Sequence, residues 1–359
     1  MILKLILVLL ALFGVYVWLG GFWRRRFAFE PGYEAIHLVK TRDDWRIALY
    51  HYPAPSRRSE TPVLLCHGLG ANRFNFDLGA EVSLARYLQQ EGFDVWSIDL
   101  RGRGHSGRCA RGESSSGKTH VFDDYVREDA GAAVRHVLGE TGASQVHWIG
   151  HSMGGLVLYA FLQGEEAESI ASGVAIASPG SYAHMSRASL SHVLSYALRV
   201  FPRIHLSFLA AGLAPLIARI RLPGERLFLN RDNVEVGPVE RALCYLVADI
   251  SRGELFQFLD WMKSGDFRTC DKGTSYERNF CKVRRPLFFV AGAKDYLVPP
   301  SSVAAAYDRI ASDRKDLLVL GRDQGQEEDY GHGDLLMGKN VRREVFPRIL
   351  EWLVSFESG

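Results

Sequence analysis

Short apolar runs alternate with longer amphipathic segments along the chain after residue 30. Several of the runs are apolar at every position, which is typical of parallel strands covered by helices on both faces. The segments between them carry apolar residues at helical spacing. The pattern predicts strands at 34–39, 46–52, 62–68, 93–100, 145–151, 173–178, 286–292 and 316–321. It predicts helices at 81–92, 125–142, 154–165, 303–313 and 343–356.

Strands and helices in this alternation predict an α/β fold with a mostly parallel central sheet and right-handed crossovers. Residues 180–285 depart from this alternation of strands and helices, because they separate two core strands by far more residues than one crossover helix requires. The stretches "SLSHVLSYALRV" and "ELFQFLDWMKSG" favour helix, so we expect a mostly helical inserted cap. The core then comprises residues 30–179 and 286–359, and a cap beside the strand ends can line a binding pocket.

The N-terminus has a different pattern. From Leu5 to Trp23 the only ionisable side chain is the phenol of Tyr16. As a helix this stretch would extend roughly 28 Å, close to the roughly 30 Å hydrocarbon core of a bilayer. We therefore expect residues 1–26 to form a single membrane anchor. The alternative is a secretory signal peptide, but a run that ends in bulky aromatic residues lacks the small-residue cleavage site.

Three arginines, Arg24 to Arg26, follow the apolar run, against Lys4 alone on its other side. The positive-inside rule then places the catalytic part on the cytoplasmic face. If the run were instead cleaved, the protein would be secreted or periplasmic.

The rest of the composition is that of a folded globular protein, with 47% hydrophobic residues, and its 43 basic and 41 acidic side chains nearly cancel. No zinc-type cysteine and histidine spacing or phosphate-binding glycine loop is present, so we expect no metal, no cofactor and no nucleic-acid partner. The oligomeric state stays open. The five cysteines are an odd number and two lie in segments expected to be buried, which suits a reducing compartment. In an oxidising space Cys270 and Cys281 are a plausible disulfide pair.

The string "WIGHSMGG" places Ser152 between a strand-like and a helix-like run. Gly150 and Gly154 flank it two residues away on either side. This is the strand, turn and helix context of a nucleophile elbow, in which a sharp turn holds the serine in strained backbone angles and leaves no room for neighbouring side chains. A G-x-S-x-G string also occurs by chance, so its context carries the prediction.

A serine hydroxyl needs a base to take its proton and an acid to orient that base. Of twelve histidines only His332 lies beyond residue 205, in the loop after the last strand. Asp295 follows the strand at 286–292 directly, and the order Ser, Asp, His fits this type of site. Asp295 could equally cap the helix that begins near Ser301. No acidic residue follows the strand at 173–178, so that alternative position for the acid is empty.

The developing oxyanion needs preorganised amide donors. The loop "CHGLGANRFNFD" follows the third strand, and its Gly68 and Gly70 allow the backbone to turn its N–H groups inward. We assign the amides of Leu69 and Met153 as the donor pair. In "DLRGRGHSG" (99–107), the arginines are expected to brace the neighbouring loops rather than to bind substrate.

Together, "CHGLG", "DLRGRGHS", "GHSMGG", "GAKDYLVPP" and "YGHGDLLMG" resemble the α/β-hydrolase superfamily, over essentially the whole chain after residue 30. The resemblance implies Ser152 as nucleophile, His332 as base, Asp295 as orienting acid, and Leu69 with Met153 as the oxyanion hole. The region from "LLCHGLG" to "GFDVWSIDL" and the spacing of His332 and Asp334 are similar to the acid-lipase branch. The segment "DLRGRGHSG" departs from that branch and is more like general esterases.

These features predict a membrane-anchored serine hydrolase that cleaves carboxylic esters of apolar, acyl-chain-bearing substrates. The same three residues would serve an acyltransferase that passes the acyl group to an alcohol or thiol. A third alternative is a catalytically silent, membrane-tethered binding protein that retains the fold.

Overall fold

The computed structural model describes residues 2–106, 119–182 and 203–357. Its centre is an eight-stranded sheet in the order β1-β2-β4-β3-β5-β6-β9-β10. The strand β2 runs antiparallel to both of its neighbours, and the remaining pairs are parallel. The strands are β1 Ala35–Lys40, β2 Arg46–Tyr52, β3 Val63–Cys66, β4 Val95–Asp99, β5 Val146–His151, β6 Ile170–Ile176, β9 Leu287–Gly292 and β10 Lys315–Leu320. The predicted α/β class and all eight predicted strands are confirmed.

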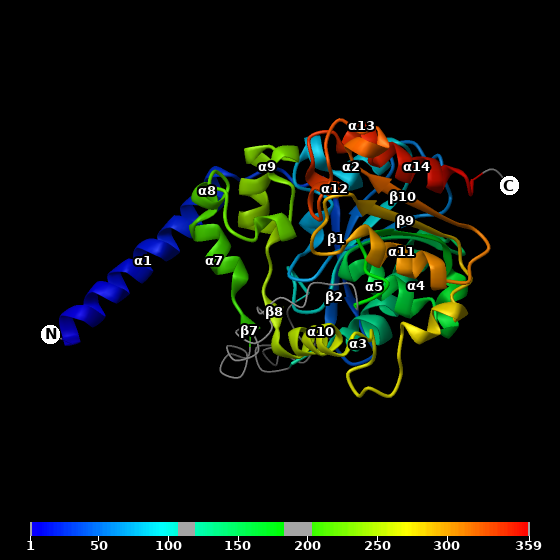
Figure 1. The fold of residues 1–359 in the computed structure, drawn as a ribbon, viewed down its shortest axis with the longest axis horizontal. Coiled ribbons are helices and arrows are strands. Elements are labelled where there is room, and N and C mark those ends of the chain that lie inside the picture. The colour runs from blue at the N-terminus through cyan, green and yellow to red at the C-terminus, as the bar shows by residue number, and fades with distance from the viewer. Residues whose placement is uncertain (1, 107–118, 183–202, 358–359) are drawn as a thin grey trace.

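Helices cover both faces of this sheet (Figure 1). Buried residues of α4 (Gly131–Thr141), α5 (Met153–Phe161) and α11 (Pro300–Arg309) belong to one hydrophobic cluster. Those of α2 (Leu84–Gln90) and α14 (Phe346–Val354) belong to the other. The strands are apolar on both faces because each face is buried under a helical layer.

Two predicted helices are interrupted. The segment expected as one helix at 125–142 consists of α3 (Phe122–Asp124), a π-helical turn (Tyr125–Ala130) and α4. The segment expected at 343–356 consists of α13 (Val341–Glu344) and α14. In the second case Pro347 lies in the first turn of α14, where its missing N–H costs nothing, whereas inside a continuous helix it would remove a hydrogen bond.

Residues 180–285 connect β6 to β9. Their described helices are α7 (Leu206–Gly212), α8 (Ala214–Ile217), α9 (Val236–Arg241) and α10 (Arg252–Ser264). Two short strands, β7 (Arg203–Ile204) and β8 (Ile250–Ser251), also pair in this segment. The helix expected at 254–265 is α10, whereas the one expected around "SLSHVLSYALRV" lies outside the described residues.

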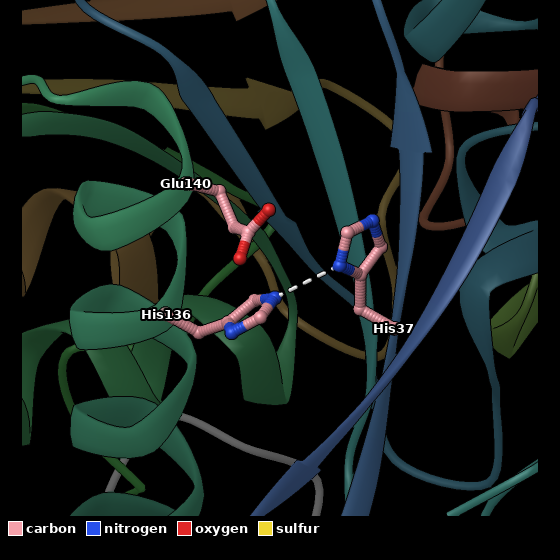
Figure 2. Close-up of side chains that lie close together, drawn as sticks. All are labelled: His37, His136 and Glu140. Atoms are coloured by element: carbon pink, nitrogen blue, oxygen red, sulfur yellow. Dashed lines mark hydrogen bonds between the residues drawn. The ribbon is translucent and has the colours of Figure 1, made fainter.

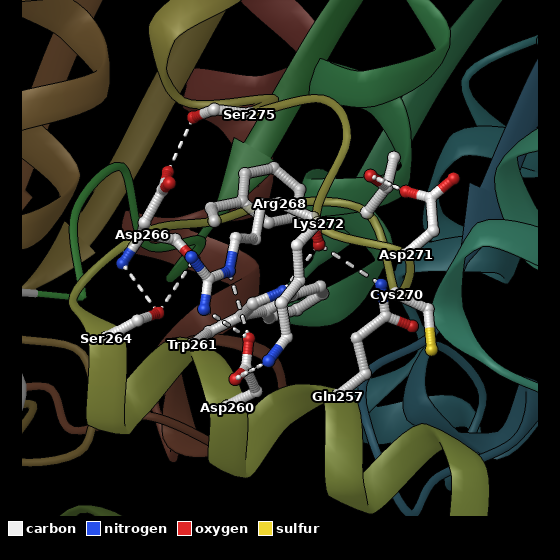
Figure 3. Close-up of polar contacts among 12 residues, drawn as sticks. Gln257, Asp260, Trp261, Ser264, Asp266, Arg268, Cys270, Asp271, Lys272 and Ser275 are labelled. Atoms are coloured by element: carbon white, nitrogen blue, oxygen red, sulfur yellow. Dashed lines mark hydrogen bonds and ion pairs between the residues drawn. The ribbon is translucent and has the colours of Figure 1, made fainter.

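The C-terminal part of this segment packs into the hydrophobic core. Trp261, Phe267 and Phe280 are fully buried in the same cluster as α4 and α5. Figure 3 shows how polar contacts fasten the loop after α10 to that helix. The Trp261 indole donates to the carbonyl oxygen of Arg268 at 2.6 Å, and the Arg268 guanidinium pairs with Asp260 at 2.9 Å.

Shorter helical turns complete the described chain. They are 3-10 turns at Arg73–Asn75, Ala80–Val82, Glu165–Ser169, Glu225–Leu227, Arg231–Asn233, Arg278–Lys282 and Arg322–Gln324, a π-helical turn at Ala242–Leu246, and α12 at Asp334–Met337.

The cysteines do not form a disulfide framework among the described residues. Cys66 and Cys244 are buried, as the sequence predicts for two of the five, while Cys270 and Cys281 are exposed free thiols. Cys109 lies outside the described residues.

The N-terminal helix α1 (Ile2–Arg26) is long and apolar enough to cross a membrane, with a mean hydropathy of 2.2 over a window that is 6% buried. A signal sequence has the same properties. The N-terminal half of α1 projects from the body of the protein, and α7 and α8 lie beside its C-terminal half (Figure 1).

Candidate active site

Ser152 occupies a tight turn between β5 and α5. Its φ of 53° and ψ of −114° are unusual for a residue with a side chain. The turn needs glycine on both sides: a Cβ on Gly150 would lie 2.3 Å from the Gly154 carbonyl, and one on Gly154 would lie 2.0 Å from the Cys66 carbonyl oxygen. The strained serine at the start of a helix is therefore the local geometry that the sequence predicts.

His332 and Asp295 meet at the carboxyl ends of the last two strands. The His332 Nδ1 atom lies 2.8 Å from Oδ2 of Asp295, and the two residues are 7% and 3% exposed. The other carboxylate oxygen accepts the amides of Leu297 and Val298 at 2.9 and 2.7 Å. Asp295 therefore does not cap the helix near Ser301, since α11 begins after Pro299.

Backbone hydrogen bonds hold the loops of Asp295 and His332 together, because the Lys294 amide donates to the Tyr330 carbonyl oxygen at 2.8 Å. Ser152 is linked to them through its neighbour His151. The His151 ring lies 4.9 Å from the His332 ring, and its Nε2 is 3.2 Å from the His332 carbonyl oxygen. Among the described residues, no hydrogen bond joins the Ser152 hydroxyl to the His332 ring.

The imidazole of His151 is buried. Burial, reinforced by the proximity of His332, lowers the pKa of His151 to about 3. A neutral neighbour places no competing positive charge beside His332 when that ring takes a proton.

The loop after β3 comes close to the serine. A Cβ on Gly68 would lie 3.3 Å from Cβ of Ser152, and Gly70 has a φ of +63°, which favours glycine. Within the described chain, neither the Leu69 amide nor the Met153 amide has a hydrogen-bond acceptor. Met153 is the first residue of α5, so its amide is one of the unsatisfied donors at a helix start.

Two residues that position this loop were not predicted from the sequence. The Asn75 side-chain oxygen accepts the Gly68 amide at 3.1 Å and lies 3.0 Å from His151 Nδ1. His67 Nε2 accepts the Leu100 amide at 3.1 Å, and burial lowers the pKa of His67 to about 4. Both lie in the loop "CHGLGANRFNFD", but the sequence does not show their partners, because each acts across the tertiary fold.

Asp334, two residues after His332, does not contact the His332 ring in any described interaction. Its carboxylate accepts the amides of Gly331 and Asn230, both at 2.8 Å, and the Asn233 side chain at 2.9 Å. It thus joins the His332 loop to residues of the 180–285 segment. Burial raises the pKa of Asp334 to about 6.

The arginines of "DLRGRGHSG" are structural, as expected. Arg101 and Arg103 are 1% and 2% exposed. Arg101 pairs with Asp129 at 2.8 Å and with Asp43 at 2.7 Å, while Arg103 pairs with Glu254 of α10 at 2.6 Å. They brace the loop after β4 and leave no free guanidinium for a substrate.

Within the part of the chain that the structure describes, one group of side chains could hold a divalent cation. His136 and Glu140 lie one turn apart on α4, and His136 Nε2 is 3.1 Å from Nδ1 of His37 on the edge strand β1 (Figure 2). As the structure stands, the two imidazoles share a hydrogen bond. The group lies on an edge strand and a flanking helix rather than on the loops that carry Ser152, Asp295 and His332.

A polar pocket of about 600 Å³ opens beside the Asp295 loop. It lies between residues 221–232 and two loops of the core, and Lys294 and Tyr296, the neighbours of Asp295, belong to its lining. Ser152 and His332 are not among the lining residues. The pocket is therefore distinct from the space in front of the serine.

Comparison with known proteins agrees with this geometry. The family described as alpha/beta hydrolase fold matches residues 61–223. Lipase 1 of Drosophila melanogaster is 24% identical over 91% of this chain and 79% of its own length. The human lysosomal acid lipase/cholesteryl ester hydrolase is 26% identical, over 89% of this chain and 88% of its own length.

Among solved structures, a soluble variant of monoglyceride lipase from Saccharomyces cerevisiae superposes with a TM-score of 0.60. The alignment covers 93% of this chain and 99% of the lipase at 17% identity, so it establishes the fold alone. The family match, the lipase relatives and the eight-stranded sheet show that the chain has the α/β-hydrolase fold, and the relatives support a carboxylic ester hydrolase of the esterase and lipase type.

Proposed function

We propose that Ser152, His332 and Asp295 form a catalytic triad that hydrolyses esters of acyl-chain-bearing lipids at a membrane. The observation that carries the proposal is the strained backbone of Ser152 at the start of α5, beside the buried pair of His332 and Asp295. Backbone strain of this kind persists where the surrounding structure imposes it, as in a nucleophile elbow.

In the proposed reaction His332 takes the Ser152 proton as the serine oxygen attacks the ester carbonyl. The oxyanion accepts hydrogen bonds from the amides of Leu69 and Met153. The proton then passes from His332 to the leaving alcohol, and an acyl-enzyme remains. Water, deprotonated by His332, attacks the acyl-enzyme, and the serine leaves with its proton restored. Asp295 holds Nδ1 of His332 protonated, so that Nε2 is free to act as the base.

The proposed organisation has three parts. They are an anchor at 1–26, a core formed by 30–179 together with 286–359, and a cap at 180–285. We further propose that α1 remains uncleaved and that the arginines at its end place the catalytic part on the cytoplasmic face. Support for an uncleaved α1 comes from its packing, since Arg24 donates to the Cys244 carbonyl oxygen at 3.2 Å. A segment removed after export has no need to fit the folded domain.

The test of the triad is labelling with a serine-directed fluorophosphonate, followed by mass spectrometry of the labelled peptide. We expect wild type to be labelled at Ser152 and the Ser152→Ala variant to stay unlabelled. The exposed Ser301→Ala is the matched control and should label as wild type does. Absence of labelling in the wild type, or labelling of the Ser152→Ala variant, would contradict the proposal.

The substrate class is tested separately with esters of increasing acyl length. Long-chain esters should be turned over faster than short ones. Equal or better turnover of short, polar esters would remove the lipid part of the proposal while leaving the hydrolase intact.

A further inference from the structure

The C-terminal half of α1 packs against α7. The rings of Phe13 and Tyr16 lie 5.7 and 5.0 Å from the ring of Phe208. The Tyr16 hydroxyl donates to the Leu209 carbonyl oxygen at 2.5 Å. Closer to the body, Gly212 fits only because it has no side chain: a Cβ there would lie 2.4 Å from the Tyr16 ring. The two helices are thus fitted to each other.

This packing conflicts with a simple picture in which α1 alone enters the membrane. The part of α1 that precedes Phe13, residues 2–12, would extend only about 16 Å at about 1.5 Å per residue. That is roughly half of the hydrocarbon core. To span the bilayer, α1 must also place the stretch from Phe13 to Trp23 in lipid. The helix α7 lies against that stretch and must go with it.

The composition of α7 and α8 fits that position. Residues 206–218, "LSFLAAGLAPLIA", contain no charged side chain. Leu209, Leu213 and Leu216 are 56%, 42% and 54% exposed, which in water would leave an apolar surface without a partner. Charges resume at Arg219 and Arg221, as they do at Arg24 in α1. Long basic side chains of this kind are favoured at the level of the lipid headgroups.

We propose that residues 206–218 (the α7–α8 segment) insert into the acyl-chain region of the bilayer beside α1. The inference rests on the proposed membrane anchor and extends it to a second embedded segment. Hydrogen bonds within the two short helices and the Tyr16 hydroxyl satisfy some of the backbone polar groups of this segment, as burial in lipid requires. At the start of α7 the Ser207 amide donates to the Asp249 carboxylate at 3.2 Å.

The α7–α8 segment also reaches the candidate active site. Its first residue, Leu206, packs against the same apolar pair, Ile250 and Leu255, as Leu69 of the proposed oxyanion loop. The Gly70 carbonyl oxygen of that loop accepts the Ala248 amide at 2.7 Å. Apolar contacts therefore connect the start of α7 with the proposed oxyanion loop, and we place the route of the acyl chain from the bilayer toward Ser152 along them. The substrate class this favours is an ester that resides in the membrane.

Photo-crosslinking tests the insertion without relying on activity. The full chain, reconstituted in phosphatidylcholine vesicles that contain tritiated phosphatidylcholine, carries a photoreactive benzoyl-phenylalanine at position 216. We expect it to cross-link to lipid as efficiently as the same group at position 10 in α1. Position 38, on the exposed side of β1, is the control and should not cross-link.

Cross-linking at position 10 but not at 216 would overturn the insertion of the α7–α8 segment and leave the anchor standing. Failure at both positions would overturn the anchor, and the insertion of the α7–α8 segment with it. Neither outcome bears on the triad, which fluorophosphonate labelling tests independently.

A second experiment measures the consequence for substrate delivery. In the double variant Leu213→Asp and Leu216→Asp, we expect hydrolysis of vesicle lipid to fall at least about tenfold, because carboxylates are excluded from hydrocarbon. Hydrolysis of a water-soluble short-chain ester should match wild type. Leu38→Asp should leave both activities unchanged. Lipid hydrolysis equal to wild type in the double variant would contradict the delivery route.

Discussion

Gly154 lies directly against Cys66, the last residue of β3, so that a Cβ at position 154 would come within 2.0 Å of the Cys66 carbonyl oxygen. The turn that carries Ser152 is therefore wedged against the strand that leads into the proposed oxyanion loop. This close contact between backbones places the proposed nucleophile beside the proposed oxyanion loop, so a change at Gly154 should affect both stability and the proposed chemistry.

Gly154→Ala should accordingly destabilise the protein by about 2–3 kcal/mol, because the methyl group meets backbone that cannot move aside. Gly139→Ala is the matched control: it lies inside α4 with nothing within 4 Å of the added Cβ. Since alanine favours helix, this change should stabilise by up to about 1 kcal/mol. Urea unfolding of both variants measures the two free energies, and similar values would contradict the packing argument.

Asp295→Asn should lower kcat for ester hydrolysis by about 10⁴-fold while KM stays near wild type, because the amide no longer holds His332 in the required tautomer. The exposed Asp308→Asn on the neighbouring helix α11 should have no effect. Steady-state kinetics on a soluble ester measures both. A loss of less than tenfold in Asp295→Asn would remove this residue from the triad.

Asn75→Ala should reduce kcat by about 10-fold or more by releasing the Gly68 amide and the His151 ring together. The residue is a positioning group, so the fall should appear in kcat and leave the pH profile in place. Thermal unfolding of the same preparation shows whether the fold is intact. A shifted pH profile would mean that Asn75 acts on the protonation of His332 instead.

The raised pKa of Asp334 predicts how the free energy of unfolding changes with pH. Its pKa of about 6 in the folded protein exceeds the ordinary value of 3.8, so between these pH values the folded state binds more protons than the unfolded state. This group therefore lowers the free energy of unfolding as pH rises from about 4 to about 6, by an amount on the order of 3 kcal/mol.

The buried His67 and His151 act in the opposite direction, because their lowered pKa values make the unfolded state the better proton acceptor. Wild type and the Asp334→Asn variant both carry these histidines. The difference between their free energies of unfolding therefore reports on Asp334 alone. Between pH 4 and 6 the unfolding free energy of the variant should rise with pH more steeply than that of wild type. Parallel curves in denaturant titrations would show that Asp334 does not titrate there.

Ester hydrolysis should persist after exhaustive dialysis against EDTA, because the proposed chemistry needs no metal. His136→Ala, which removes one member of the group in Figure 2, should leave kcat within about twofold of wild type. Activity that is lost on dialysis and restored by Zn²⁺ would assign that group a role in the reaction.

The sequence alone was sufficient for the strand order along the chain and for the local turn at Ser152. Each depends on short-range rules: fully apolar runs form covered strands, and a serine flanked by glycines between a strand and a helix can adopt strained angles. The sequence also predicts that Ser152, Asp295 and His332 lie at the same edge of the sheet. Each of them comes after a parallel strand, and the carboxyl ends of parallel strands share one edge.

Tertiary structure decided what short-range patterns cannot encode. Asn75 reaches Gly68 and His151, and Asp334 reaches Asn230, through contacts between loops that are distant in sequence. The fit of Tyr16 and Gly212 joins α1 to the α7–α8 segment, nearly 200 residues away. From hydropathy alone, α1 reads as an isolated anchor. Only the packed helices show that, if α1 spans a bilayer, α7 must enter it too, because the free part of α1 is too short to cross.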